Sequence, residues 1–259
     1  MSANQSQDRP LAEVRAKLAR AGETLGLLEG EITTFLRDGP GPMTFNGDVD
    51  LFAQQVKAHT DRAVPRRLSI LAGEVVHHLR SCLDYIVWEL TASQLKPRRS
   101  ARIEFPVFER EPADKNTRKI FDAKVAGIPD RAREMIERLQ PYHAPNTVLN
   151  GPLNHPLMLI HDLDRIDKHR QLSIAVCGFS ITTSGQAGSY IMWMRYASAT
   201  ESEIGTLAPK LDPEGRIRPE VAFLEFGGRR IEPVVPGLRR LVRYVSELVD
   251  LFEHECFSS

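Results

Sequence analysis

Residues 68–90, LSILAGEVVHHLRSCLDYIVWEL, carry the pattern that decides the fold class. Aliphatic side chains recur there at intervals of three or four residues, at Leu68, Leu71, Val75, Leu79, Leu83, Ile86 and Leu90. Side chains at that spacing share one face of an α-helix. The stretch therefore predicts a long amphipathic helix from Leu68 to Leu95, and it indicates that helices dominate this part of the chain.

Aliphatic stripes with the same spacing predict further helices on both sides of this one. The predicted helices are Leu11–Phe35, Asn116–Val125, Arg131–Leu139, Pro156–Leu172 and Leu238–Phe252. After Leu172 the period changes to two, which is typical of strands. The predicted strands are Leu172–Thr183 and Tyr190–Ala197, joined as a hairpin, and Val221–Phe226 and Arg229–Ile231, joined through Gly227-Gly228. A further strand is favoured between Thr44 and Thr60, and Ile103–Phe108 is predicted to be extended.

This order of elements predicts an α+β protein. The helical N-terminal two-thirds, about 10–171, packs with a small antiparallel sheet, and a C-terminal amphipathic helix closes the fold within 172–257. We expect one domain over residues 1–259, because no low-complexity linker divides the sequence. Residues 1–9 are polar and are expected to form a disordered leader.

The composition limits the classes of partner. Lys plus Arg equals Asp plus Glu at 34 each, so no whole-molecule field attracts nucleic acid, and RNA binding would need a local basic patch. The expected patch is Lys96, Arg98, Arg99 and Arg102. Three widely spaced cysteines indicate a reducing compartment, and the longest near-apolar run, Ser173–Ile181, is too short to span a bilayer. We expect a cytoplasmic protein with no membrane partner and no cofactor.

The predicted helix at residues 68–95 carries an unusual polar face. Glu74, His78, Ser81 and Tyr85 fall in one row by helical spacing, with His77, Asp84 and Trp88 beside it and Arg80 nearer the apolar border. A solvated face usually carries Lys, Glu and Gln, whereas this one carries adjacent histidines and aromatic residues. The face is therefore either a site or an ordinary surface, and the sequence leaves both readings open.

The predicted helix at Pro156–Leu172 continues its aliphatic stripe with charged residues. Asp167 and Arg170 occupy positions where Ile160, Leu163 and Ile166 predict further apolar side chains. A buried charge needs a partner, and Arg80 or His77 is the expected partner of Asp167. An internal salt bridge that orients the two helices is favoured over catalysis as the explanation of these charges, because such networks also perturb pKa values without chemistry. His161, Asp164 and Lys168 are expected on a solvated face.

Three blocks of sequence resemble a group of uncharacterised bacterial proteins of similar size. The blocks are Gly73-Glu74-x-x-His77-x-Leu79-Arg80-Ser81-x-Leu83-Asp84, then Phe105-Pro106-Val107-Phe108, then Asp167-Lys168-His169-Arg170. The resemblance extends over most of the chain from about Leu68 onward, and it implies no activity by itself. In that group the position of Tyr85 is commonly His.

With His at position 85, the helix would carry an Arg-x-x-x-x-His element that resembles the active motif of HEPN domains. Those helical domains are often metal-independent ribonucleases acting at a dimer interface. The resemblance therefore implies a metal-independent, RNA-directed hydrolase or an inactive relative, in a homodimer. Arg80 would stabilise the scissile phosphate, and residue 85 would transfer a proton. Tyr85 is a poor base near neutral pH. The candidate catalytic residues are therefore His77, Arg80, Asp84, Tyr85, Asp167, His169 and Arg170.

Two alternatives to a ribonuclease remain open from the residues. Glu74 and His77 could bind a metal ion with Asp164 and His169, because Glu-x-x-His places two ligands on one helical face. The polar residues could instead fix helix register in a non-enzymatic interaction or oligomerisation module. Whether the chain is an enzyme is not decided by the sequence.

Overall fold

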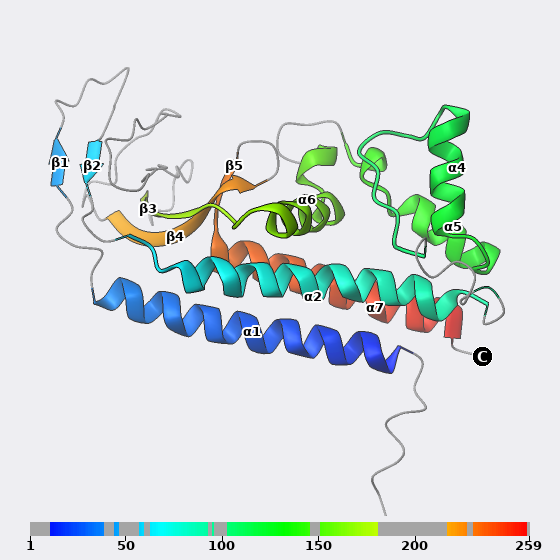
Figure 1. Cartoon of the computed structure of the whole chain (residues 1–259), viewed down its shortest axis with the longest axis horizontal. Helices are drawn as coiled ribbons and strands as arrows, with labels where there is room; N and C mark the ends of the chain where they lie inside the picture. The colour runs from blue at the N-terminus through cyan, green and yellow to red at the C-terminus, as the bar shows by residue number, and fades with distance from the viewer. Residues whose placement is uncertain are drawn as a thin grey trace, which may run out of the picture. The chain divides into compact units, whose positions relative to one another are not determined.

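The computed structural model describes residues 11–38, 44–46, 57–59, 63–92, 95, 103–145, 151–180, 217–226 and 230–257. Within these ranges the protein is α+β and mostly helical, as the sequence predicts (Figure 1). The helices are α1 (Ala12–Arg37), α2 (Arg66–Leu90), α4 (Lys115–Lys124), α5 (Asp130–Arg138), α6 (Pro156–His169) and α7 (Val234–Phe257). Short 3-10 turns occur at η2 (Pro141–His143) and η3 (Pro152–Asn154).

The chain forms two compact units that share its three longest helices. The first comprises residues 1–25, 72–171 and 238–259, and the second comprises residues 26–71 and 172–237. The prediction of a single domain is not tested by this division, and it stays a prediction.

The first unit is built around the N-terminal half of α1, most of α2 and most of α7. Apolar residues of all three helices are buried, among them Val14, Leu79, Leu83, Val245 and Phe252. Cys82 of α2 donates to the carbonyl oxygen of Val14, and Arg15 of α1 pairs with Asp250 of α7 at 2.9 Å. The helix α6 and the pair α4 and α5 complete this unit, which contains every candidate catalytic residue predicted from the sequence.

The second unit contains the strands. The strand β3 (Ile174–Ser180) pairs antiparallel with β4 (Ile217–Phe226), and β4 pairs antiparallel with β5 (Arg230–Pro233) (Figure 1). The predicted second hairpin is therefore confirmed. The predicted strand Tyr190–Ala197 lies outside the described residues. Between Thr44 and Thr60, β1 (Thr44–Asn46) and β2 (Lys57–His59) pair antiparallel.

Segment 103–108 joins no described sheet. It follows α2 in the first unit and is assigned neither helix nor strand, although Ile103 and Phe105 are buried. Its backbone groups consequently need partners other than a neighbouring strand, because buried amide and carbonyl groups are costly when unpaired. Side chains of α2 and of the chain after α5 provide those partners, and this determines where the polar residues of α2 lie.

No described helix combines the length and the apolar character needed to cross a membrane.

Candidate functional site

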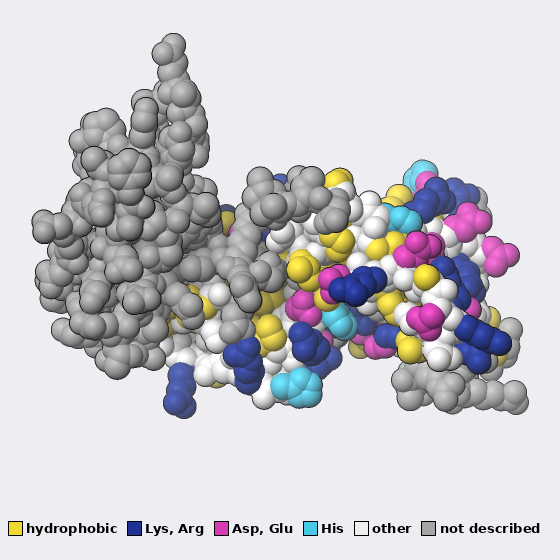
Figure 2. Space-filling view, turned by 90° about the horizontal axis from the view of Figure 1, so that it is seen from above, with side chains coloured by type: hydrophobic (Ala, Val, Ile, Leu, Met, Phe, Trp, Pro, Cys, Tyr) yellow, Lys and Arg dark blue, Asp and Glu magenta, His cyan; other side chains and the backbone are white. Residues whose placement is uncertain are grey.

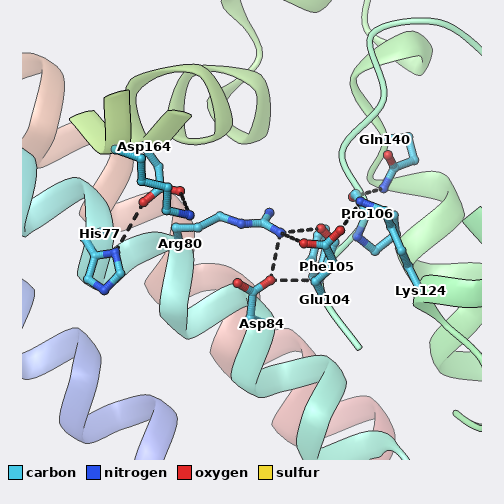
Figure 3. A network of polar contacts seen from close by, with 10 residues as sticks. His77, Arg80, Asp84, Glu104, Phe105, Pro106, Lys124, Gln140 and Asp164 are labelled. Atoms are coloured by element: carbon cyan, nitrogen blue, oxygen red, sulfur yellow. Dashed lines mark hydrogen bonds and ion pairs between the residues drawn. The ribbon is translucent and has the colours of Figure 1, made fainter. Parts of the chain in front are cut away.

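The helices α2 and α6 meet through a histidine and a buried carboxylate. His77 Nδ1 lies 3.4 Å from Asp164 Oδ1, and the Asp164 side chain is only 6% exposed, whereas that of His77 is 56% exposed (Figure 3). Lys168, one turn along α6, places its Nζ 2.6 Å from Asp164 Oδ2. An exposed imidazole is thus held from one side by a carboxylate that the fold fixes in position.

The burial of Asp164 corrects the expectation that it lies on a solvated face. Leu157, Leu159, Ile160 and Leu163 are buried with it, so the buried face of α6 is wider than the predicted stripe. Asp164 lies four residues after Ile160, at the edge of that face, where it reaches His77 of α2. Its exposed partner Lys168 remains at the surface, as the sequence predicts.

Asp167 also faces α2, but its neighbour is a glycine. A Cβ built on Gly73 would lie 2.3 Å from Asp167 Oδ1, so the carboxylate lies directly against the α2 backbone. Burial raises the pKa of Asp167, the negative charge of Asp164 raises it further, and His77 opposes the shift. Of the two expected partners of Asp167, Arg80 contacts Phe105 and Asp84 instead, whereas His77 does act on the pKa of Asp167.

Arg170 is exposed, in contrast to the expectation that it points inward. The helix α6 ends at His169, and the backbone of Arg170 is extended, with φ −160° and ψ 157°. Because helical spacing no longer applies there, the side chain does not continue the α6 stripe. His169 is exposed as well.

Arg80 faces segment 103–108 and is buried, with 6% exposure. Its Nη2 donates to the carbonyl oxygen of Phe105 at 2.9 Å and lies 2.8 Å from Asp84 Oδ1 (Figure 3). The same Asp84 oxygen accepts from the backbone N–H of Phe105 at 2.9 Å. Arg80 and Asp84 thereby form hydrogen bonds with the carbonyl oxygen and the N–H of Phe105, as a neighbouring strand would.

Gln140 and Lys124 extend this network beyond α2. Gln140 Nε2 donates to the carbonyl oxygens of Pro106 at 2.9 Å and Ile136 at 3.0 Å, and its Oε1 accepts from the N–H of Phe108 at 3.1 Å. Lys124 of α4 pairs with Glu104, which also lies 3.7 Å from Arg80 Nη2. The sequence pattern did not predict that Glu104, Lys124 and Gln140 take part in this network. Helical periodicity does not specify how segment 103–108, α4 and the chain after α5 pack together.

The electrostatics around Arg80 follow from burial. Burial raises the pKa of Asp84, against the lowering effects of Arg80 and of the hydrogen bond from Phe105. Burial likewise lowers the pKa of His161, and the positive charge of Arg80 lowers it further. Arg80 Nη1 is buried and has no hydrogen-bond acceptor within the described parts of the chain. His161 is half-buried, which corrects the expectation of a solvated position.

Arg80 and Tyr85 are not brought together. Residues five apart on a helix differ by about 140° in direction, because each residue turns the helix by about 100°. Arg80 accordingly contacts segment 103–108, whereas Tyr85 is 38% exposed and lies beside Lys17 of α1, whose Nζ is 5.8 Å from the ring centroid. The Arg-x-x-x-x-Tyr element therefore forms no single cluster within one chain.

The other expectations receive less support. Within the described ranges, no three His, Cys, Asp or Glu side chains gather closely enough to hold a metal ion, so the set Glu74, His77, Asp164 and His169 gains no support from its placement. The expected basic patch of Lys96, Arg98, Arg99 and Arg102 lies outside the described residues. On the face shown in Figure 2, basic and acidic side chains are interspersed.

Comparison of the chain with protein-family models, with curated proteins and with solved structures finds no match.

Proposed function

We propose that this chain is a metal-independent, RNA-directed ribonuclease whose acid and base lie where α2 meets α6. One observation carries the proposal: the exposed His77 ring is held at Nδ1 by the buried carboxylate of Asp164. A histidine oriented in this way presents its second ring nitrogen to a substrate, which is the arrangement that general bases require. With His in place of Tyr85, the Arg80 element of α2 would resemble the active motif of HEPN domains, which are often ribonucleases.

The tautomer of His77 follows from its partner. The Asp164 carboxylate pairs with the Lys168 ammonium at 2.6 Å, and an ionised carboxylate only accepts hydrogen bonds. Nδ1 therefore carries the proton toward Asp164, and Nε2 keeps the lone pair. His77 Nε2 is then the base, and Asp164 is a positioning residue that acts through it.

Asp167 is the proposed general acid. Its pKa is raised by burial and by Asp164, so it holds a proton at a higher pH than an ordinary aspartate does. Acid and base roles commonly fall to neighbouring groups whose environments separate their pKa values. The exposed ammonium of Lys168 lies in the same cluster and would attract a phosphate.

The proposed reaction uses the nucleophile that RNA itself contains. His77 Nε2 takes the proton of a ribose 2′-hydroxyl, the 2′-oxygen bonds to phosphorus, and the bond from phosphorus to the 5′-oxygen breaks as Asp167 protonates that oxygen. The products are a 2′,3′-cyclic phosphate and a 5′-hydroxyl. A protein nucleophile is not required.

The test is cleavage of a labelled single-stranded oligoribonucleotide in EDTA, with identification of both product ends. Wild-type protein should produce cyclic phosphate ends, and His77→Ala should reduce the rate about 10²- to 10⁴-fold. Asp164→Asn should lower kcat more than it raises KM, because it weakens the orientation of His77 and removes a charge that raises the pKa of Asp167. His254→Ala is the matched control, since His254 is exposed on α7, away from the proposed site, and its replacement should leave the rate unchanged.

Absence of cleavage by folded wild-type protein over a broad set of RNA sequences would refute the proposal. Equal loss of rate in His77→Ala and His254→Ala would also count against it, because the loss would then not depend on the Asp164 contact. A cytoplasmic location and a homodimer follow only from the sequence and the resemblance, and they stay predictions.

A second function, a non-enzymatic interaction module, is favoured by one specific observation. Nη2 of Arg80 is fully engaged by Phe105 and Asp84, so this arginine anchors segment 103–108 instead of presenting itself to a phosphate. If the network serves only to hold segment 103–108, substitution of Arg80 should reduce stability. Neither the wild-type protein nor His77→Ala should then cleave RNA. The RNA cleavage assay therefore separates the two functions.

A further inference from the structure

A lysine and an exposed tyrosine lie side by side on the surface formed by α1 and α2. Lys17 Nζ is 5.8 Å from the centroid of the Tyr85 ring, and the Tyr85 residue is 38% exposed. A large aromatic ring is usually shielded from water more fully than this. Lys17 lies over one face of the Tyr85 ring. Proteins that bind single-stranded nucleic acid combine positive charge, which holds the backbone, with exposed aromatic rings, on which bases stack.

The pKa of the neighbouring His78 depends in part on the charges around this surface. Its pKa is lowered, first by burial and then by the positive charges of Lys17, His77 and Arg20. Glu74 alone among the named contributors opposes the shift. Arg20 also pairs with Glu23 at 3.0 Å, so it is partly neutralised, whereas Lys17 has no carboxylate partner within the described residues. Most of the charged groups that act on the pKa of His78 are therefore basic, although the whole chain is neutral.

This surface is continuous with the proposed base. The rings of His77 and His78 lie 6.3 Å apart, centroid to centroid, so α2 presents His77 toward α6 and His78 toward α1. Tyr85 lies two turns farther along the row that contains His78 and Ser81. A strand lying across α2 could thus contact Lys17 and Tyr85 while its next nucleotides reach His77.

We propose that Lys17, His78 and Tyr85 form a binding track for single-stranded RNA beside His77. The inference deepens the proposed ribonuclease function and rests on it for the identity of the ligand. An unpaired base stacks on the face of the Tyr85 ring that Lys17 does not cover, and Lys17 neutralises an adjacent phosphate. The track should prefer single strands, because a base within a duplex has no exposed face available for stacking on a protein side chain.

Binding can be measured without cleavage by using a 2′-O-methyl oligonucleotide, which lacks the free 2′-hydroxyl that the proposed reaction needs. Fluorescence anisotropy of a labelled 2′-O-methyl uridine strand should show salt-dependent binding to the wild-type full chain. Tyr85→Leu should weaken binding about fivefold or more, whereas Tyr85→Phe should stay within about twofold of wild type, because Phe keeps the ring face. Lys17→Gln should reduce the slope of log Kd against log salt by about 0.7.

Lys119→Gln supplies the matched control, because Lys119 is an exposed lysine on α4 outside the track. It should leave the affinity and the salt slope close to wild type. Circular dichroism of each variant verifies that the helices are retained. A duplex of the same sequence should bind more weakly than the single strand, and its affinity should not respond to Tyr85→Leu.

The outcomes distinguish this inference from the proposed function. If the 2′-O-methyl strand binds as expected but unmodified RNA is not cleaved, the track stands and the ribonuclease proposal fails. If unmodified RNA is cleaved, and Tyr85→Leu and Lys17→Gln neither weaken binding nor slow cleavage, the ribonuclease stands and the track is refuted. Failure of wild-type protein to bind the single strand at low salt overturns the track, as does equal weakening by Lys119→Gln.

Discussion

The carboxylate of Asp167 occupies the space that a side chain at Gly73 would need, because a Cβ built there would lie 2.3 Å from Asp167 Oδ1. The glycine of the Gly73-Glu74 block and the aspartate of the Asp167-Lys168 block are therefore two sides of one contact. No helical-propensity argument favours glycine within a helix, since glycine is about 1 kcal/mol less favourable there than alanine. The close approach of Asp167 supplies a physical reason for it.

Gly73→Ala should consequently reduce activity more than stability. The added methyl group displaces the Asp167 carboxylate, but the better helix propensity of alanine offsets part of the strain, so the free energy of unfolding should change by less than about 2 kcal/mol. Loss of the proposed acid should slow RNA cleavage about 10²-fold or more. Gly22→Ala is the control, because nothing lies within 4 Å of a Cβ at that position. It should be neutral or slightly stabilising, with unchanged cleavage.

The pair Arg80 and Asp84 should contribute to stability as a unit. Arg80→Leu leaves the Asp84 carboxylate without its cationic partner, and it leaves the carbonyl oxygen of Phe105 without its donor. We expect a loss of about 2–4 kcal/mol in urea unfolding. Arg80→Leu combined with Asp84→Asn should lose less than the sum of the two single variants, because each single variant leaves one charge of the pair without its partner and the double variant leaves none. Strict additivity would show that the two side chains do not act together.

Asp167 sets the expected dependence of the cleavage rate on pH. A general acid must be protonated, and the raised pKa of Asp167 extends its protonated form to higher pH. The rate should therefore rise as the pH is lowered from neutral, until the base is protonated as well. Asp167→Asn should remove the acidic rise and lower the rate about 10²-fold, measured as kcat against pH. A wild-type rate that increases steadily toward alkaline pH would contradict the assignment.

His155 should make the fold sensitive to mild acid. Burial lowers its pKa from 6.5 to about 4, and its Nδ1 accepts from the N–H of Leu157 at the start of α6. A folded-state pKa below the unfolded value means that the unfolded chain binds the proton first, so stability is complete above about pH 6.5 and falls as the pH drops toward 4. The expected loss is about 1–2 kcal/mol, because the ring retains some contact with water.

Urea unfolding at pH 7 and pH 5 measures this effect of His155. His155→Asn should flatten the pH dependence, since asparagine can also cap a helix without titrating. His143→Asn, at an exposed histidine, should leave the dependence as it is in wild type. If His143→Asn flattens the curve as strongly as His155→Asn, the acid sensitivity arises elsewhere.

The candidate site was only partly predictable from the sequence. The row on α2 was visible because helical spacing places His77, His78 and Tyr85 on polar faces, and the unusual position of Asp167 was visible because it interrupts an aliphatic stripe. The partner of each side chain was not visible. Periodicity specifies which face of one helix a residue occupies, but it does not specify the register in which two helices pack.

By itself, therefore, the sequence determined the helices, the later change to strands and the polar character of one face of α2, because these depend on intervals along a single segment. Tertiary structure alone decided that Asp164 and not Asp167 pairs with His77, that Asp167 lies against Gly73, and that Arg80 holds the backbone of Phe105. It also decided that Arg170 is exposed, because α6 ends one residue before it and the helical spacing that predicted an inward position no longer applies. Contacts between segments distant in sequence depend on packing register and on where each helix stops, and neither is encoded in the period of one helix.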